Sequence, residues 1–361
     1  MTLEPQFALA DIRMRVQRHL TDFLAEQIQY LGEIGTELIP VAEAMNTFLL
    51  DGGKRLRPLF AYCGYLAAGG EDDDAIIGAV SSLELLQACA LIHDDLMDGS
   101  DTRRGRPSIH RWFEAIHENE ELAGSASSYG KSAAVLLGDL ALVWSDQMLH
   151  RSGIRSDALL RSLSVHDEMR VELMAGQFLD AHEQALASQS VARSLKIARF
   201  KSGKYTVERP LHFGVFLAQP DEKRRSTYTT IFSEFGLPLG EAFQLRDDLL
   251  GVFGDPSVTG KPAGDDLREG KRTVLMAMTQ DRATEQQERI ISKLFGDPNL
   301  TDAGIEEIQM IITNTGAREH VEELIEKLTL TALDALNRDE IGSDTHALLD
   351  ELASNAVRRS V

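Results

Sequence analysis

Residues 83–99 read Leu-Glu-Leu-Leu-Gln-Ala-Cys-Ala-Leu-Ile-His-Asp-Asp-Leu-Met-Asp-Gly. The apolar residues recur at the helical period, so the stretch predicts an apolar helix that ends in aspartates. Asp94 and Asp98 lie one turn apart on one face, where like charges repel and where the helix dipole disfavours acids. These two penalties indicate a bound cation. Oxygen ligands without His or Cys partners suit Mg²⁺ that also contacts phosphate oxygens, and the alternative is a solvated acidic helix end.

Two arginines follow the aspartates directly, in Asp101-Thr102-Arg103-Arg104-Gly105. Arginine is the side chain best suited to bidentate binding of phosphate. An acidic, metal-binding face beside an arginine pair therefore predicts a diphosphate site. In the alternative interpretation, Arg103 and Arg104 form salt bridges with the neighbouring acids.

A second helix also ends in paired acids, within Gln244-Leu245-Arg246-Asp247-Asp248-Leu249-Leu250-Gly251. A basic, glycine-rich loop follows it, containing Lys261, Arg268, Lys271 and Arg272. Carboxylates on different helices of a bundle are a common way to build a metal site. Near the N-terminus, Gly52–Pro58 places three cations beside glycines, where the backbone can approach a polyanion closely.

The composition restricts the class of protein. The 361 residues include 37 Lys and Arg against 57 Asp and Glu, a net charge of −20, which argues against nucleic acid as a partner. Two cysteines are too few for a disulfide scaffold or a cysteine metal site. Because no secretory signal and no uncharged stretch of membrane-spanning length occur, we expect a soluble, cytoplasmic protein without stable membrane insertion.

Helical spacing recurs along the whole chain, and most of the 10 prolines fall at breaks between long segments. No alternating strand of useful length is present. The sequence therefore predicts one all-α domain over residues 1–361, with frayed ends at about 1–9 and 354–361. Two linkers interrupt the helices, at 99–107 and 254–272.

Five motifs in order resemble the trans-isoprenyl diphosphate synthases, or polyprenyl synthetases, and most closely the geranylgeranyl diphosphate synthases. They are Gly-Gly-Lys-Arg-Leu-Arg-Pro from Gly52, His-Asp-Asp-Leu-Met-Asp with Arg-Arg-Gly, Gly176-Gln177-Phe178-Leu179-Asp180, Lys201-Ser202-Gly203, and Gln244 to Asp248 with its lysine loop. The resemblance implies an isoprenoid synthase-type bundle of long antiparallel helices around a deep central cavity, and a homodimer.

The resemblance also implies a reaction. An allylic diphosphate, bound through Mg²⁺, ionises to a carbocation and diphosphate. The double bond of isopentenyl diphosphate then attacks the cation, and loss of a proton leaves a product five carbons longer. Fixed cations and Mg²⁺ stabilise the charge on the departing diphosphate more than they stabilise the bound substrate.

Site residues are carried over by position. The residues with catalytic roles are Asp94, Asp95, Asp98, Arg103, Lys201, Asp247 and Lys261, and the metal ligands among the acids are Asp94, Asp98, Asp247 and Asp248. Arg103 would hold the allylic diphosphate, and isopentenyl diphosphate would be held by Lys54, Arg57, Gln87 and Arg104. Lys201 and Lys261 would bind the leaving diphosphate, in a site lined by Gln177, Asp180, Ser202, Gln244 and Lys271.

Two positions depart from the family pattern. Gly251 stands where members often have a third aspartate, and Asp255 is a candidate to compensate for it. Ser202 stands where threonine is common and keeps the hydroxyl. Both departures bear on the second acidic cluster and its neighbours, and Gly251 leaves that cluster with one carboxylate fewer than is usual in the family.

Product length is predicted from the residues just before the first cluster, where bulky aromatics stop elongation early in the family. Here Cys89 and Ala90 are small, and Leu86 would form a deeper floor of the cavity. A twenty-carbon product, geranylgeranyl diphosphate, is therefore expected, with a longer polyprenyl chain as the alternative. In a second interpretation, Cys89 and Ala90 are packing residues only.

Two other functions compete with this one. A class I terpene cyclase shares the fold, but it does not use isopentenyl diphosphate, so Lys54, Arg57 and Arg104 argue against it. A non-catalytic subunit of a synthase tends to lose the acids of the first cluster, which this chain retains.

Overall fold

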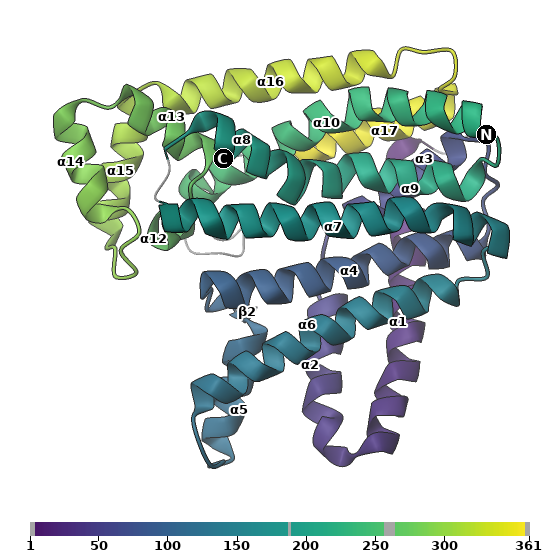
Figure 1. Ribbon diagram of the computed structural model, residues 1–361, viewed down its shortest axis with the longest axis horizontal. Coiled ribbons are helices and arrows are strands. Elements are labelled where there is room, and N and C mark those ends of the chain that lie inside the picture. The colour runs from purple at the N-terminus through teal and green to yellow at the C-terminus, as the bar shows by residue number, and fades with distance from the viewer. Residues whose placement is uncertain (1–3, 187–188, 256–263, 358–361) are drawn as a thin grey trace. The chain divides into compact units, whose positions relative to one another are not determined.

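The computed structural model describes residues 4–186, 189–255 and 264–357, and helices dominate them (Figure 1). This confirms the predicted all-α fold, including helices as long as the 32 residues of α10 (Glu222–Phe253). Contacts divide the chain into two compact units, Met1–Ser162 with Gly214–Pro220 and Leu163–Phe213 with Asp221–Val361.

The first unit is built around α4 (Asp74–Asp98), which packs against α6 (Ala126–His150), α3 (Leu56–Ala67) and α1 (Pro5–Ile34). Its remaining elements are η1 (Thr36–Leu38), α2 (Ile39–Leu50), β1 (Thr102–Arg103), β2 (Arg106–Pro107), α5 (Ile109–Asn119) and the first turns of α7 (Ser156–Leu186). In Figure 1, α1 and α2 form an antiparallel pair. Fully buried Leu20, Met45 and Leu83 form part of the core of this unit.

The bounds of α4 follow from its sequence. The Asp73 side chain accepts a hydrogen bond from the Ile76 amide at 2.9 Å, and Gly99 ends the helix with φ +69°. Among the described residues, α4 is the one helix long and apolar enough to cross a membrane, but 78% of its most apolar window is buried inside the protein. Such burial is typical of a core helix, so α4 presents its terminal aspartates from a rigid element.

The second unit is built around α10, which packs against α16 (Ala317–Ala335) and against η2 (Ala198–Glu208), a π-helix. Figure 1 shows α16 running along α10, with α14 and α15 paired at one end of this unit. Its other elements are α8 (Val191–Ile197), α9 (Arg209–Ala218), α12 (Asp265–Glu269), α13 (Val274–Arg282), α14 (Glu285–Leu294), α15 (Asp302–Asn314) and α17 (Ser343–Val357). The remainder of α7 also belongs to this unit, and the end of α9 belongs to the first.

Helix covers more of the two chain ends than the sequence predicts. The first helix begins at Pro5, where proline is favoured in a first turn, and buries Leu9. The last runs to Val357, which is buried together with Ala356. Burial of these apolar side chains offsets the fraying that end position alone would suggest.

Candidate active site

The first aspartate cluster lies at the C-terminal end of α4, as predicted. Asp94 and Asp98 are half-buried, whereas Asp95 between them is only 1% exposed. Arg103 holds the Asp95 carboxylate with both ends of its guanidinium, Nε at 2.7 Å and Nη2 at 2.5 Å. The salt-bridge interpretation is therefore confirmed for Arg103.

The bonds to Asp95 keep Arg103 charged. Burial alone would lower the pKa of this guanidinium, but the hydrogen bonds and charge of Asp95 outweigh burial and raise the pKa. Nη2 of Arg103 also lies 3.8 Å from an Asp94 oxygen. The predicted diphosphate-binding arginine is thus fixed beside the predicted metal ligands.

Arg103 and Arg104 sit on a tight hairpin that the sequence analysis treated as a linker. β1 and β2 pair with Arg103 opposite Arg106. The two turn residues, Arg104 and Gly105, have φ of +52° and +74°, as a type I′ turn requires. The two neighbouring arginines of the hairpin contact different partners. Arg103 binds Asp95, whereas Arg104 donates to the carbonyls of Asp51 and Gly52 at 3.0 and 3.4 Å.

A cationic loop therefore forms where Arg104 meets the Gly52–Pro58 stretch. Burial, and then the charges of Arg55 and Arg103, lower the pKa of Arg104, so an anion beside it would be stabilised. Gln87 lies on α4, and its buried Oε1 has no hydrogen-bond partner among the described residues. The residues predicted to hold isopentenyl diphosphate all belong to the first unit, and they are Lys54, Arg57, Gln87 and Arg104.

The three residues predicted to set product length also lie on α4. Ala90 is half-buried, one turn before Asp94. Cys89 and Leu86 are fully buried, and Cys89 Sγ lies 3.8 Å from His93 Nδ1. Burial raises the pKa of the Cys89 thiol to about 11, so it is a neutral packing group.

The second aspartate cluster lies near the end of α10. Asp247 is half-buried, and Asp248 is buried with its Oδ1 accepting a 2.8 Å hydrogen bond from Gln244. Burial first, and then the charges of Asp266 and Asp247, raise the pKa of Asp248 to about 7. Such crowding of carboxylates would be relieved by a divalent cation.

Asp266 is a candidate that the sequence analysis missed. A Cβ placed on Gly251 would lie 1.9 Å from Asp266 Oδ2, so this carboxylate fills the space next to the missing third aspartate. Asp255, the compensating residue considered from sequence, is exposed. The predicted site residue Lys271 lies beside Asp266, with Nζ 3.4 Å from its carboxylate, and forms a closer ion pair of 2.7 Å with Glu269 at the end of α12.

Lys201 and Ser202 lie on the π-helix η2, a form often found at functional sites. The Lys201 ammonium donates to Asp180 on α7 at 2.6 Å. The motif glycines Gly176 and Gly203 lie where the segments meet. A Cβ on Gly176 would lie 2.5 Å from Lys201 N, and a Cβ on Gly240 of α10 would lie 2.4 Å from Gly203 Cα. The two interfaces tolerate no side chain at these positions.

Gln177 is half-buried on α7 in the same unit.

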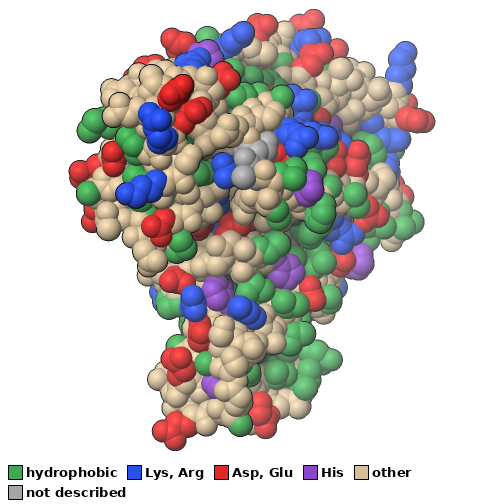
Figure 2. All heavy atoms as spheres, turned by 60° about the vertical axis from the view of Figure 1, so that its left-hand side comes forward, with side chains coloured by type: hydrophobic (Ala, Val, Ile, Leu, Met, Phe, Trp, Pro, Cys, Tyr) green, Lys and Arg blue, Asp and Glu red, His purple; other side chains and the backbone are tan. Residues whose placement is uncertain are grey.

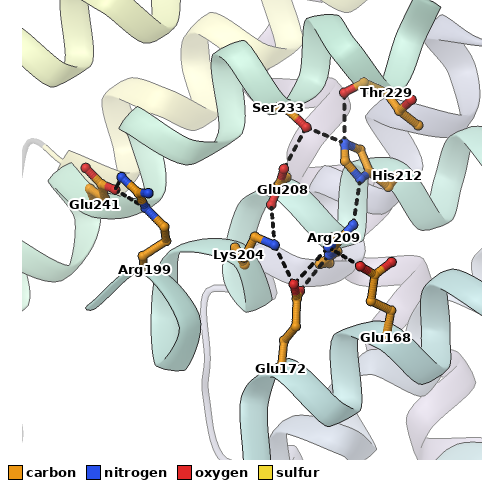
Figure 3. Close-up of polar contacts among 10 residues, drawn as sticks. All are labelled: Glu168, Glu172, Arg199, Lys204, Glu208, Arg209, His212, Thr229, Ser233 and Glu241. Carbon is orange, nitrogen blue, oxygen red and sulfur yellow. Dashed lines mark hydrogen bonds and ion pairs between the residues drawn. The ribbon is translucent and has the colours of Figure 1, made fainter. Parts of the chain in front are cut away.

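A buried ion network lies next to the predicted phosphate-binding lysine (Figure 3). The Glu172 carboxylate on α7 accepts hydrogen bonds from the Lys204 ammonium and from Arg209 Nε, the latter at 2.7 Å. Burial alone would raise the pKa of Glu172, but the bonds from Arg209 and Lys204 outweigh burial and lower it. These pairs join α7 to η2 at Lys204 and to the start of α9 at Arg209, in addition to the Lys201–Asp180 contact.

The same network continues to α10 through a neutral histidine. Burial and the charge of Arg209 lower the pKa of His212 to about 3. Its Nε2 lies 3.0 Å from the Thr229 carbonyl, so Nε2 carries the proton and donates. Ser233 donates to Glu208 at 2.6 Å and completes the connection (Figure 3). η2 is thereby held against both α7 and α10.

The donor set fits magnesium that shares its coordination with a diphosphate. Each cluster offers carboxylate oxygens, which are the ligands that Mg²⁺ prefers, and neither cluster relies on His or Cys. Within the described ranges, no three such side chains lie close enough together to hold an ion alone. A bound diphosphate would offer further oxygen ligands of the kind that Mg²⁺ accepts. Lys261, predicted to bind the leaving diphosphate, lies outside the described residues.

Acidic and basic side chains are interspersed over the face drawn in Figure 2. The cations that matter for an anionic substrate are therefore the local ones described above.

Comparison with known proteins gives a consistent result. A profile of the polyprenyl synthetase family matches residues 40–312. Geranylfarnesyl diphosphate synthase of Aeropyrum pernix is 29% identical over 96% of this chain and 99% of its own length. Geranylgeranyl diphosphate synthase of Sulfolobus acidocaldarius is 28% identical over 88% of this chain and 90% of its own. The crystal structure of geranylgeranyl pyrophosphate synthase from Corynebacterium glutamicum, complexed with isoprenyl diphosphate and magnesium, matches with a TM-score of 0.93 and 41% identity, over 98% of this chain and 99% of that one.

Proposed function

The chain belongs to the polyprenyl synthetase family, and on that premise we propose that this prenyltransferase joins isopentenyl diphosphate to an allylic diphosphate, head to tail and with Mg²⁺. One observation carries the proposal. The first unit holds a pair of half-buried carboxylates, Asp94 and Asp98, beside the charged guanidinium of Arg103, and separately a cationic loop at Arg104. Two anionic substrates require two such sites.

In the first unit, Asp94 and Asp98 hold the divalent cation, and Asp95 keeps Arg103 aimed at the allylic diphosphate. The bound cation stabilises the negative charge that grows on the departing diphosphate. Lys54, Arg57, Arg104 and Gln87 bind and orient isopentenyl diphosphate for attack. Because the carbocation reacts with a positioned double bond, no side-chain nucleophile is needed.

In the second unit, Asp247 and Asp248 hold further Mg²⁺, and Lys201 neutralises the leaving diphosphate. Lys201 is already charged and fixed by Asp180, which lowers the reorganisation required during the reaction. We assign to Asp266 the part that a third aspartate plays elsewhere, because its carboxylate lies against Gly251.

The assignment of Asp266 can be separated from that of Asp255. Asp266→Asn is expected to raise the Mg²⁺ concentration for half-maximal activity by about tenfold or more, since groups around a metal commonly contribute that much to affinity. Asp255→Asn, an exposed change of the same chemistry, is the matched control with less than about a twofold effect. Titration of Mg²⁺ against initial rate, with Mn²⁺ binding measured in parallel, tests this. The reverse order of effects would assign the role to Asp255.

The product we propose is geranylgeranyl diphosphate, with a longer polyprenyl diphosphate as the alternative. This rests on the small Ala90, which shares the α4 face of Asp94. Ala90→Phe is expected to shorten the main product by about one isoprene unit, because an aromatic ring blocks the growing chain. Met97→Phe, an exposed change on the same helix, should leave product length unchanged. Chromatography of the dephosphorylated products measures both, and an unchanged product in Ala90→Phe would remove Ala90 from the cavity wall.

The decisive experiment is incubation with Mg²⁺, isopentenyl diphosphate and allylic diphosphates of increasing length, followed by sizing of the products. Elongation by one or more five-carbon units is expected, and EDTA should abolish it. A cyclic hydrocarbon without elongation would instead identify a terpene cyclase. No turnover with any allylic substrate would identify a non-catalytic subunit.

We further propose that the chain works as a cytoplasmic homodimer without stable membrane insertion. Support comes from exposed apolar side chains on α6, of which Leu136 and Val143 are 65% and 61% exposed, since unpartnered apolar faces favour association. Burial of most of α4 supports the absence of a membrane span. Light scattering on the purified chain measures the assembly state.

A further inference from the structure

The three cations of the Gly52–Pro58 stretch have different surroundings. Lys54 is exposed and Arg57 is half-buried, but Arg55 is only 4% exposed. The sequence pattern grouped them as one basic cluster. Burial separates Arg55 from the other two and directs its guanidinium into the first unit.

The Arg55 guanidinium joins three helices. Nη1 donates to Glu84 on α4 at 2.6 Å, and Nη2 donates to Gln17 on α1 at 2.8 Å. Nη2 also donates to the Leu49 carbonyl at 2.6 Å, in the last turn of α2, where the helix dipole favours a cation. Glu84 is 6% exposed, so neither partner of the ion pair can be lost without leaving a buried charge.

The backbone at Arg55 depends on these contacts. Arg55 has φ +53°, in the left-handed region that disfavours side chains, and its carbonyl accepts the Leu59 amide at 3.2 Å to begin α3. A non-glycine residue persists there only when its surroundings hold it. Fixing Arg55 therefore fixes the direction of Lys54 before it and of Arg57 in the first turn of α3.

The same contacts bring a second guanidinium to the loop. A Cβ placed on Gly53 would lie 3.3 Å from Arg55 Nη1 and 3.5 Å from Arg104 Nη2. Two like charges thus lie against one glycine, and the Glu84 carboxylate neutralises the inner one. Glu84 is also one turn before Gln87 on α4, so a single helix carries both the anchor and a predicted substrate ligand.

We propose that Arg55 is a positioning residue for isopentenyl diphosphate, whose buried bond to Glu84 sets the loop that presents Lys54 and Arg57 to the substrate. This inference rests on the proposed function. Arg55 does not itself contact the diphosphate, because its guanidinium is directed into the protein. Its effect is therefore specific to isopentenyl diphosphate and leaves the allylic substrate, bound at the aspartates, largely unaffected.

The test uses the full chain and compares Arg55→Met/Glu84→Met with the wild type. Replacing both partners by apolar groups of similar length avoids leaving a buried charge, so the fold is retained. The double variant is expected to bind isopentenyl diphosphate about ten- to a hundredfold more weakly by calorimetry, as small displacements of binding groups commonly cost that much. Its KM for the allylic substrate should change less than about twofold. Arg55→Lys keeps the charge but can donate to fewer groups. Its affinity for isopentenyl diphosphate should therefore lie between those of the wild type and the double variant.

Arg151→Met is the control, because Arg151 forms an exposed ion pair with Glu26 in the same unit. It should bind both substrates as the wild type does. Two results would overturn the inference alone. One is a folded double variant that binds isopentenyl diphosphate with wild-type affinity. The other is a double variant that binds both substrates equally weakly and has a lowered melting temperature. A wild-type chain that binds no isopentenyl diphosphate would overturn the proposed function, and the inference with it.

Discussion

Asp94→Ala is expected to lower kcat by about a thousandfold or more while the melting temperature stays within a few degrees of the wild-type value. Removing the half-buried Asp94 carboxylate takes away one of two metal ligands on the same helical face. A loss of this size corresponds to about 4 kcal/mol of transition-state stabilisation, within the range for metal-ion catalysis. Single-turnover rates at saturating substrates and Mg²⁺, with circular dichroism on the same sample, measure the two quantities.

Asp74→Ala provides the matched control for Asp94→Ala. Asp74 lies at the other end of the same helix, and its side chain is 74% exposed. An acid in that first turn stabilises the helix, and Asp74 also forms exposed ion pairs with Arg15 and Arg18 of α1. Full activity in Asp94→Ala, or an equal loss in Asp74→Ala, would contradict the assignment of the first cluster.

Lys201→Gln is expected to lower kcat by about a hundredfold or more, with a smaller change in the KM for isopentenyl diphosphate. Lys201 is held by Asp180 and η2 before substrate arrives, so its charge is placed for the leaving diphosphate. Removing one fixed charge of this kind commonly costs two to three orders of magnitude. Initial rates with both substrates varied separate the kcat effect from the KM effect.

The loss must be distinguished from an unpaired Asp180, which is 9% exposed. Lys201→Gln/Asp180→Asn leaves no unpaired charge, and it should be as inactive as the single variant. Lys196→Gln, an exposed change on the neighbouring α8, should be fully active. Recovery of activity in the double variant would show that Asp180, and not the diphosphate, needs the cation.

The parts of the fold that depend on local sequence were predictable. The bounds of α4 follow from helical periodicity, the Asp73 cap and Gly99, and all three signals lie within or next to the helix. The shared face of Asp94 and Asp98 follows from the same periodicity. Arg103 was correctly placed beside the acids, because only a short linker separates them.

Features that depend on distant segments were not predictable. The role of Arg55 needs Gln17 and Glu84, which come from other helices, so a basic loop looks the same from sequence whether its arginine faces in or out. Asp266 comes close to Gly251 only through the packing of α12. The π-helical form of η2 around Lys201 was not predicted, because apolar periodicity separates helix from strand and not one kind of helix from another.

The close approach of backbones at Gly176, Gly203 and Gly240 has a consequence for how this protein can vary. A methyl group added at Gly176 or Gly240 would come within 2.5 Å of backbone atoms, whereas one at Gly203 would meet its nearest neighbour at 3.2 Å. Variants with a side chain at Gly176 or Gly240 should therefore fail to fold correctly, whereas Gly203 should accept alanine after a small shift of its neighbours. Space at the glycine contacts therefore restricts substitution in this region more strongly than charge does.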